Sequence, residues 1–286
     1  MRSLGFALVV LSLAGCGGGS GGGPGPVQTP DVQTLTGSQA PVETAADQNA
    51  RAPAMLARAD FLAVTTLHGE TSDSNIPTFK LRSSCSATRC TFTEPQSGYG
   101  WVVDTADLEF SGETEAILTK HGITMGLTRA PEYRGYASWM TYGAFGVGDE
   151  RATIEGVSVR GRYALAGGDL TGSRPSGSAT WRGLMAGTPA TGVGRGQILQ
   201  GDATLTYRLS GTLDASFTNI KNIDTLRAHA VTSARFTGIP VAANGTFSAG
   251  GTGNKIQGGF HGSGHSETTG VFEQSGIVGA FGAKRQ

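Results

Sequence analysis

The sequence predicts an all-β protein whose antiparallel strands close into a barrel or a sandwich. Three observations predict this class: 46 glycines among 286 residues, apolar residues that alternate with polar ones, and glycine-rich turns between the alternating segments. The glycines show no G-X-Y period, which excludes collagen, and they suit turns and bulges. Strands with one apolar face need closure or a second sheet to cover that face.

The chain begins with a predicted export signal. Arg2 precedes the apolar run LGFALVVLSL. This run is shorter than the roughly 20 residues of a membrane-spanning helix, and the pattern is typical of a signal peptide. The next residues, LAGC, resemble a bacterial lipobox, so we expect removal of residues 1–15 and lipidation of Cys16. The alternative is an ordinary signal peptide with an incidental cysteine.

A tether rich in glycine, serine and proline is expected over 16–45. Such a sequence behaves as a flexible coil, with an r.m.s. reach on the order of 30 Å. Gly17 and Gly18 follow the cysteine, and the absence of aspartate there is typical of lipoproteins sorted to the outer membrane. We therefore expect a lipid-anchored outer-membrane protein. The sequence leaves open which side of the membrane the head faces.

A helix is expected over 45–66, ahead of the first strands. The apolar residues that recur at helical spacing are Met55, Leu56, Ala59, Leu62 and Ala63. Asp47 is expected to cap the start, and Pro53 to begin the well-formed part, because proline suits a first helical turn. Shorter and less regular strand candidates follow, so we predict an N-terminal subdomain of helix and strands over 46–131.

Regular strands are expected over 132–286. The clearest alternation is in ATLTYRL, where Ala203, Leu205, Tyr207 and Leu209 share one face. VSVRGRYAL and SGTLDASFTNI repeat the same period. An integral outer-membrane barrel shows this alternation too, but many of these segments are shorter than the roughly 9 to 11 residues of a spanning strand.

Charge and motifs argue against two functional classes. The chain has 22 basic and 22 acidic residues and a formal net charge of zero, so the positive field of a nucleic-acid-binding protein is missing. No G-x-S-x-G nucleophile elbow appears, and no serine, histidine and carboxylate cluster stands out. We expect no catalysis and no catalytic residue.

Cys85 and Cys90 form a C-x₄-C pair in SSCSATRCTF. In an oxidising compartment such a pair can close a small loop across a hairpin, so we predict a disulfide. The alternative is a metal site, although no second cysteine or histidine pair lies near it in the sequence. The spacing is not that of a C-x-x-C redox motif.

Two C-terminal stretches resemble the β-barrel of the transferrin-binding protein B family of surface lipoproteins. They are FHGSGHSETTGVF and GIVGAFGAKR, which resemble a family pattern of F-Y-G-P, a turn with a glutamate, G-G-x-F and then G-x-F-G-A-K-R. The matching positions are Phe260, Gly262, Glu267, Gly270, Phe272, Gly279, Phe281, Gly282, Ala283, Lys284 and Arg285. The resemblance covers about 136–285 and implies an eight-stranded barrel.

The resemblance also implies a function. It suggests a lipoprotein that binds, without catalysis, a protein or an iron- or haem-containing ligand, in iron acquisition. The partner would be a host or environmental iron-carrier protein, with haem or iron as a ligand rather than a resident cofactor. Relatives that bind transferrin are longer and have two lobes, so transferrin itself is not predicted. The alternatives are a structural or assembly lipoprotein without a small-molecule ligand, and a pore.

His261 and His265 surround the sequence GSG. Residues four apart on a strand are about 13 Å apart, so both rings reach one metal only if the glycines turn. In the resemblance, His261 replaces a tyrosine at a strand end and His265 lies in the turn. We interpret them as rim and turn residues, with a metal site as the second hypothesis. His68, His121 and His229 stand alone and are expected on the surface or in the core.

Aromatic and arginine side chains are the candidates for a protein interface. They are Tyr133, Arg134, Tyr136, Trp139, Tyr142, Trp181 and Arg182. The alternative, which we favour, is that they form the core and rim of the barrel.

Overall fold

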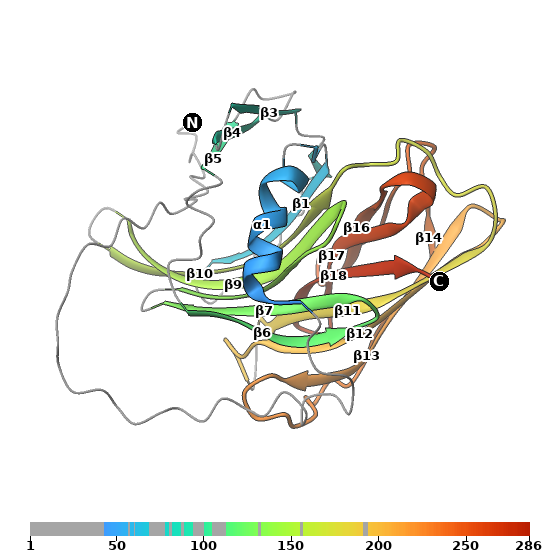
Figure 1. Cartoon of the computed structure of the whole chain (residues 1–286). Helices are drawn as coiled ribbons and strands as arrows, with labels where there is room; N and C mark the ends of the chain where they lie inside the picture. The colour runs from blue at the N-terminus through green and yellow to red at the C-terminus, as the bar shows by residue number, and fades with distance from the viewer. Residues whose placement is uncertain are drawn as a thin grey trace, which may run out of the picture.

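The structure, a computed structural model, is built almost entirely from antiparallel strands (Figure 1). It describes residues 43–56, 58–59, 61–68, 78–79, 82–86, 89–93, 100–104, 113–130, 133–154, 157–190 and 194–286. The lipobox and most of the tether lie outside these residues. Within them, no helix has the length and hydropathy of a membrane-spanning segment. The predicted all-β class is confirmed.

Two large sheets and one small sheet make up the fold. The seven-stranded sheet has the order β2 (Thr78–Phe79), β1 (Phe61–His68), β10 (Val157–Gly168), β9 (Gly143–Ile154), β8 (Tyr133–Trp139), β7 (Ile123–Ala130) and β6 (Glu113–Lys120). The eight-stranded sheet has the order β14 (Ala234–Pro240), β13 (Thr212–Asn222), β12 (Leu199–Tyr207), β11 (Ala179–Pro189), β18 (Ile277–Arg285), β17 (Glu267–Gln274), β16 (Asn254–His261) and β15 (Thr246–Gly251). The small sheet contains β3 (Arg82–Ser86), β4 (Arg89–Thr93) and β5 (Gly100–Asp104).

The eight-stranded sheet curls into a nearly closed barrel, as predicted. Its two end strands, β14 and β15, approach each other, and a bridge between Val241 and Phe247 joins them. Buried and more exposed residues alternate as expected: in β13, Leu213, Ala215 and Phe217 are buried. Leu209 differs from the prediction. It lies in the turn after β12 and is 76% exposed, because β12 ends at Tyr207.

The predicted domain boundary at residue 131 does not separate the two large sheets. β7 and β8 lie on either side of that point and pair with each other, from Gly126 opposite Ala137 to Ala130 opposite Tyr133. β8, β9 and β10 therefore belong to the seven-stranded sheet, and the barrel begins with β11. Alternation shows which side chains share a face, but it does not show which strand pairs with which.

The predicted helix is correct only in its first half. α1 (Ala45–Leu56) begins after Thr44, whose side chain accepts a hydrogen bond from the Asp47 N–H, while Asp47 accepts one from the Thr44 N–H. Pro53 lies inside the helix rather than at its start. The second half is wrong because Phe61–His68 forms β1, which pairs with β10 along its whole length.

α1 packs against the seven-stranded sheet. Gln48 is buried and its side-chain oxygen accepts a hydrogen bond from the Trp139 N–H at 2.9 Å, while Arg51 donates to the Trp139 carbonyl at 2.6 Å. Met55 is buried on the same helix. The helix is therefore a packing element on β8.

The barrel strands β11, β17 and β18 are buried on both faces. Inside the barrel, Ile277, Phe281 and Ala283 of β18 join the aromatic core. On the other face, Val278 and Ala280 pack with the core of the seven-stranded sheet. This explains why the C-terminal run is apolar and small at nearly every position rather than alternating.

Glycines of the barrel face phenylalanines on the neighbouring strand. Gly270 lies opposite Phe281, and Gly279 lies opposite Phe272. A Cβ at Gly270 would come within 2.5 Å of the Phe281 ring, and one at Gly279 within 2.6 Å of the Phe272 ring. Each ring therefore covers the bare backbone of its partner glycine. This packing is the physical reason for the G-V-F and G-A-F motifs at the C-terminus.

Candidate functional site: a filled barrel and its outer surface

The barrel interior is filled by its own aromatic side chains. Phe217 stacks on Phe272 with ring centroids 4.3 Å apart, and Phe281 lies 5.2 Å from Phe217. Nearer one end, Trp181 lies 4.8 Å from Phe260. All five rings are 0% exposed. Any ligand of the barrel must therefore bind to its outer surface or to its loops.

A tyrosine hydroxyl joins the two large sheets. Tyr136 of β8 is buried and donates a hydrogen bond to the side-chain oxygen of Gln200 on β12 at 2.6 Å. Burial raises the pKa of Tyr136, so the hydroxyl stays a neutral donor. The seven-stranded sheet is thus fixed to the barrel by a specific polar contact as well as by apolar packing.

The carboxylate of Glu267 provides a second link between the sheets. Glu267 begins β17 and is 3% exposed. It accepts hydrogen bonds from the backbone N–H groups of Thr141, Tyr142 and Gly143, at 3.1, 2.8 and 3.1 Å, in the turn between β8 and β9. The sequence marked Glu267 as a motif position without giving it a role. The signal was an acidic residue at the start of a predicted strand.

We expect Glu267→Gln to lower the free energy of unfolding by about 1–3 kcal/mol. The glutamine amide has one oxygen instead of two. Some of the three backbone N–H groups therefore lose a charged hydrogen-bond acceptor in a buried site. Urea unfolding followed by circular dichroism measures the change. Glu115→Gln, at a half-buried position in β6, is the matched control. Equal midpoints for the two variants would contradict this role.

His261 ends β16, the strand-end position that the sequence indicated, but its side chain is buried rather than exposed at the rim. Its exposure is 0%, and its Nε2 lies 2.8 Å from the Thr269 hydroxyl. The ring packs against bare backbone of the seven-stranded sheet, since a Cβ at Gly168 or Gly143 would come within 2.9 or 3.3 Å of it. Burial lowers the pKa of His261 to about 3, and a hydrogen bond with the Asp169 backbone opposes this only in part.

His265 is a turn residue, as predicted. It lies in η1 (Ser263–His265) with φ of 58°, and its Nε2 is 2.8 Å from the carbonyl oxygen of Ser173. The partners of His265 and His261 thus belong to different elements. Among the described residues, no group of three or more histidine, cysteine and acidic side chains could hold a metal. The geometry gives the metal hypothesis no support.

Cys85 and Cys90 face each other across a hairpin. β3 and β4 form a hairpin in which Cys85 lies directly opposite Cys90. This backbone register is one that a cross-strand disulfide needs, and the disulfide stays a prediction. Cys16 lies outside the described residues, so lipidation is also a prediction.

Most of the predicted interface side chains form the core and the junction. Tyr136 and Trp181 are fully buried, and the Trp181 indole N–H donates to the His265 carbonyl at 2.7 Å. Arg134 pairs with Asp224 through two hydrogen bonds. The exception is Arg182 of β11, which is exposed on the outer face of the barrel.

Of three comparisons with known proteins, only the search of solved structures gave matches. No protein-family model and no curated protein matches the sequence. Among solved structures, transferrin-binding protein B isotype 1 of serogroup B Neisseria meningitidis matches at 16% identity and a TM-score of 0.42, over 79% of this chain and 43% of that one.

A single-lobe structure matches over nearly its whole length. The N-lobe of lactoferrin-binding protein B of Moraxella bovis is 11% identical, with a TM-score of 0.36, over 79% of this chain and 98% of that one. A structure described as a surface lipoprotein is 10% identical, with a TM-score of 0.39, over 79% and 99%. The chain spans less than half of the two-lobed transferrin-binding protein B. At these identities the likeness concerns the fold alone.

Proposed function

We propose that this chain is an outer-membrane lipoprotein, anchored through Cys16, whose β head binds a protein partner on its outer surface without catalysis. The observation that carries the proposal is the aromatic filling of the barrel by rings such as Phe217, Phe272 and Phe281. Small molecules are held in concave pockets, whereas an outer sheet surface suits a macromolecule. The export signal and the tether support display of the head away from the bilayer.

The direction of the side chains favours this proposal over a pore. A membrane-spanning porin has an apolar outer face and a polar lumen. In this barrel the inward side chains, such as Phe217, are buried and apolar, while Asp214, Thr218 and Arg235 are on the outer face. The arrangement is the reverse of that expected for a water-filled channel.

Iron-carrier proteins are the first partners to test. The C-terminal motif resembles that of a family of such binders, and by name the structurally similar proteins bind transferrin and lactoferrin. Haem is a second ligand to test. The buried ring of His261, with Thr269 as its partner, does not support haem ligation at that residue.

The lipid anchor is tested by metabolic labelling with radiolabelled palmitate in a bacterial host. We expect the full chain to incorporate label and Cys16→Ala to abolish it. Cys85→Ser is the matched control, since it removes a cysteine of different predicted role, and it should label like the wild type. Label that persists in Cys16→Ala would overturn the anchor.

Partner binding is tested by biolayer interferometry with the full lipidated chain in detergent. The probes are iron-loaded transferrin, lactoferrin and haemoglobin, with free haem followed by its absorption spectrum. Saturable binding of a carrier protein supports iron acquisition. Absence of binding to every probe, with correct labelling and folding, would favour the structural or assembly lipoprotein instead.

A further inference from the structure

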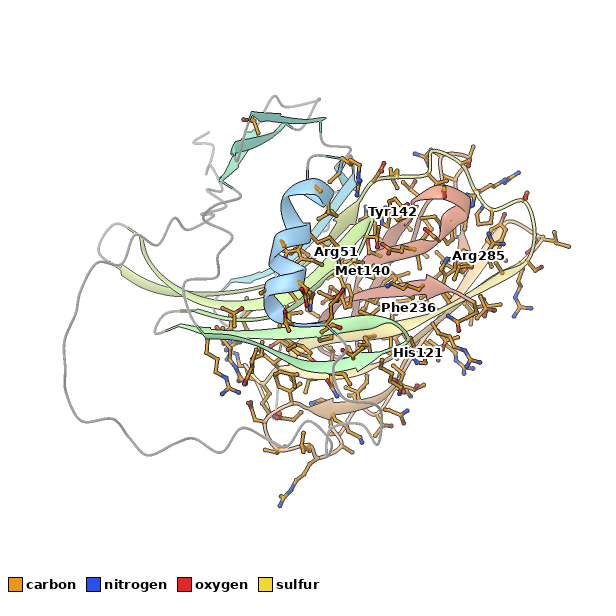
Figure 2. All side chains as sticks on the ribbon, viewed as in Figure 1. Arg51, His121, Met140, Tyr142, Phe236 and Arg285 are labelled. Atoms are coloured by element: carbon orange, nitrogen blue, oxygen red, sulfur yellow. The ribbon has the colours of Figure 1, made fainter. Side chains whose placement is uncertain are left out.

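Four basic side chains from three parts of the fold meet on the outer face of the barrel. They are Lys120 and His121 on the β6–β7 hairpin, Arg182 on β11 and Lys284 on β18, and we call them the basic patch. Arg182 and Lys284 are directly opposite each other on paired strands. Lys284 reaches the hairpin, where its Nζ donates to the Gly122 carbonyl at 2.5 Å. Figure 2 shows His121 at the hairpin tip, beside the barrel strands.

The turn geometry places His121 at this tip. His121 and Gly122 are the two central residues of the hairpin turn, with φ of 55° and 69°. Positive φ at both positions is typical of a type I′ turn, whose twist matches that of paired strands. Lys120 and Ile123 pair directly beside the turn. A short, well-fixed hairpin therefore presents the imidazole at a defined place on the barrel surface.

The patch has more positive than negative charge. Asp202 of β12 binds Lys120, with Nζ and Oδ1 2.6 Å apart, and also accepts a hydrogen bond from Asn219 at 2.8 Å. The other nearby carboxylate is Glu267, the strand partner of Lys284, and it is bound by three backbone N–H groups. Arg182 makes no ion pair with any other residue that the structure describes. One guanidinium is thus available to an outside anion.

The pKa of the His121 imidazole depends on the charges of this patch. Burial lowers its pKa, and the positive charges of Lys120 and Arg182 lower it further, while Asp202 opposes them. The imidazole is therefore neutral at pH 7. A docked anion would reverse the local balance and favour its protonated form.

We propose that the basic patch is the docking site for a carboxylate-rich segment of the partner protein. This inference rests on the proposed function and specifies the chemistry of the partner. Arginine binds carboxylates through two parallel hydrogen bonds, and Arg182 is exposed for such a contact. Attachment to anionic lipid headgroups would need a larger cluster, typically of four to eight lysines and arginines.

The test measures binding of a fluorescent deca-glutamate peptide to the full chain by fluorescence anisotropy in detergent. We expect saturable binding at low salt that weakens strongly by 0.5 M salt, since exposed charges are screened. Arg182→Glu should weaken it at least about tenfold. Arg235→Glu makes the same charge change on β14, which is three strands from β11 in the sheet order. It should bind like the wild type.

A second readout separates specific docking from general attraction. The His121 ring signal is titrated by NMR with and without the peptide, and its pKa should rise when the peptide is bound. Equal losses in Arg182→Glu and Arg235→Glu, or an unchanged His121 pKa, would overturn the patch. Binding only to vesicles with anionic lipids would also overturn it. A carrier protein that binds Arg182→Glu as tightly as the wild type contradicts this inference and leaves the proposed function intact.

Discussion

Phe281→Ala is expected to lower the free energy of unfolding by about 3–5 kcal/mol, the range for removing a buried phenylalanine from a packed core. The ring is 0% exposed and lies 5.2 Å from Phe217 and 6.5 Å from Phe247. It also covers the backbone of Gly270 on the neighbouring strand. The filled interior leaves few ways for neighbours to collapse into the space. Urea unfolding followed by tryptophan fluorescence and circular dichroism measures the loss.

The control for this change is Leu209→Ala. Leu209 is 76% exposed in the turn after β12, so its replacement should change the free energy of unfolding by no more than about 0.5 kcal/mol. A similar loss in both variants would show that the aromatic column does not determine the stability of the barrel.

Acidification is expected to destabilise the fold through His261. Its pKa in the folded chain is about 3, below the ordinary value of about 6.5. Between these values the unfolded chain binds the proton and the folded chain does not, so stability is lost as the pH falls below about 6.5. Each pH unit in this window costs about 1.4 kcal/mol, so the loss from this group between pH 6.5 and 4.5 is about 2–3 kcal/mol.

Unfolding midpoints in urea between pH 7 and 4.5 test this dependence. His261→Gln should show a flatter dependence on pH, even though it is less stable at pH 7, because glutamine does not titrate. His229→Gln replaces a half-buried histidine in the loop after β13 and should keep the wild-type slope. If His261→Gln kept the full slope, carboxylates rather than this imidazole would cause the acid sensitivity.

Local patterns in the sequence were enough to predict the all-β class and the strands of the barrel. The alternation in β12 and β13 reflects a repeat of two residues, and it is visible without knowledge of any partner strand. The short hairpin at Gln274 and Ile277 follows from a Ser275–Gly276 turn with φ of 54° and 74°. In β18 a period of two places Ile277, Gly279, Phe281 and Ala283 on one face, although apolar residues occupy both faces of the strand.

The sequence also indicated some residues of the candidate site, but it did not indicate what each of them does. Glu267 and Lys284 were singled out as motif positions, and Arg182 as an interface candidate. His121 was seen only as an isolated histidine. These residues come from three strands and one hairpin turn, so no local spacing in the sequence could show that they lie together. The pairing of β11 with β18 and the contact of Lys284 with Gly122 bring them together.

The sequence by itself determined the strand content, the turns and the apolar interior of the barrel, since these depend on neighbours within a few residues. The tertiary structure alone decided that β8, β9 and β10 join the seven-stranded sheet and that Phe61–His68 is a strand. It also decided that His261 is buried between two sheets. Hydrogen bonding between distant strands fixes these features, and a period of two is the same whichever partner a strand finds.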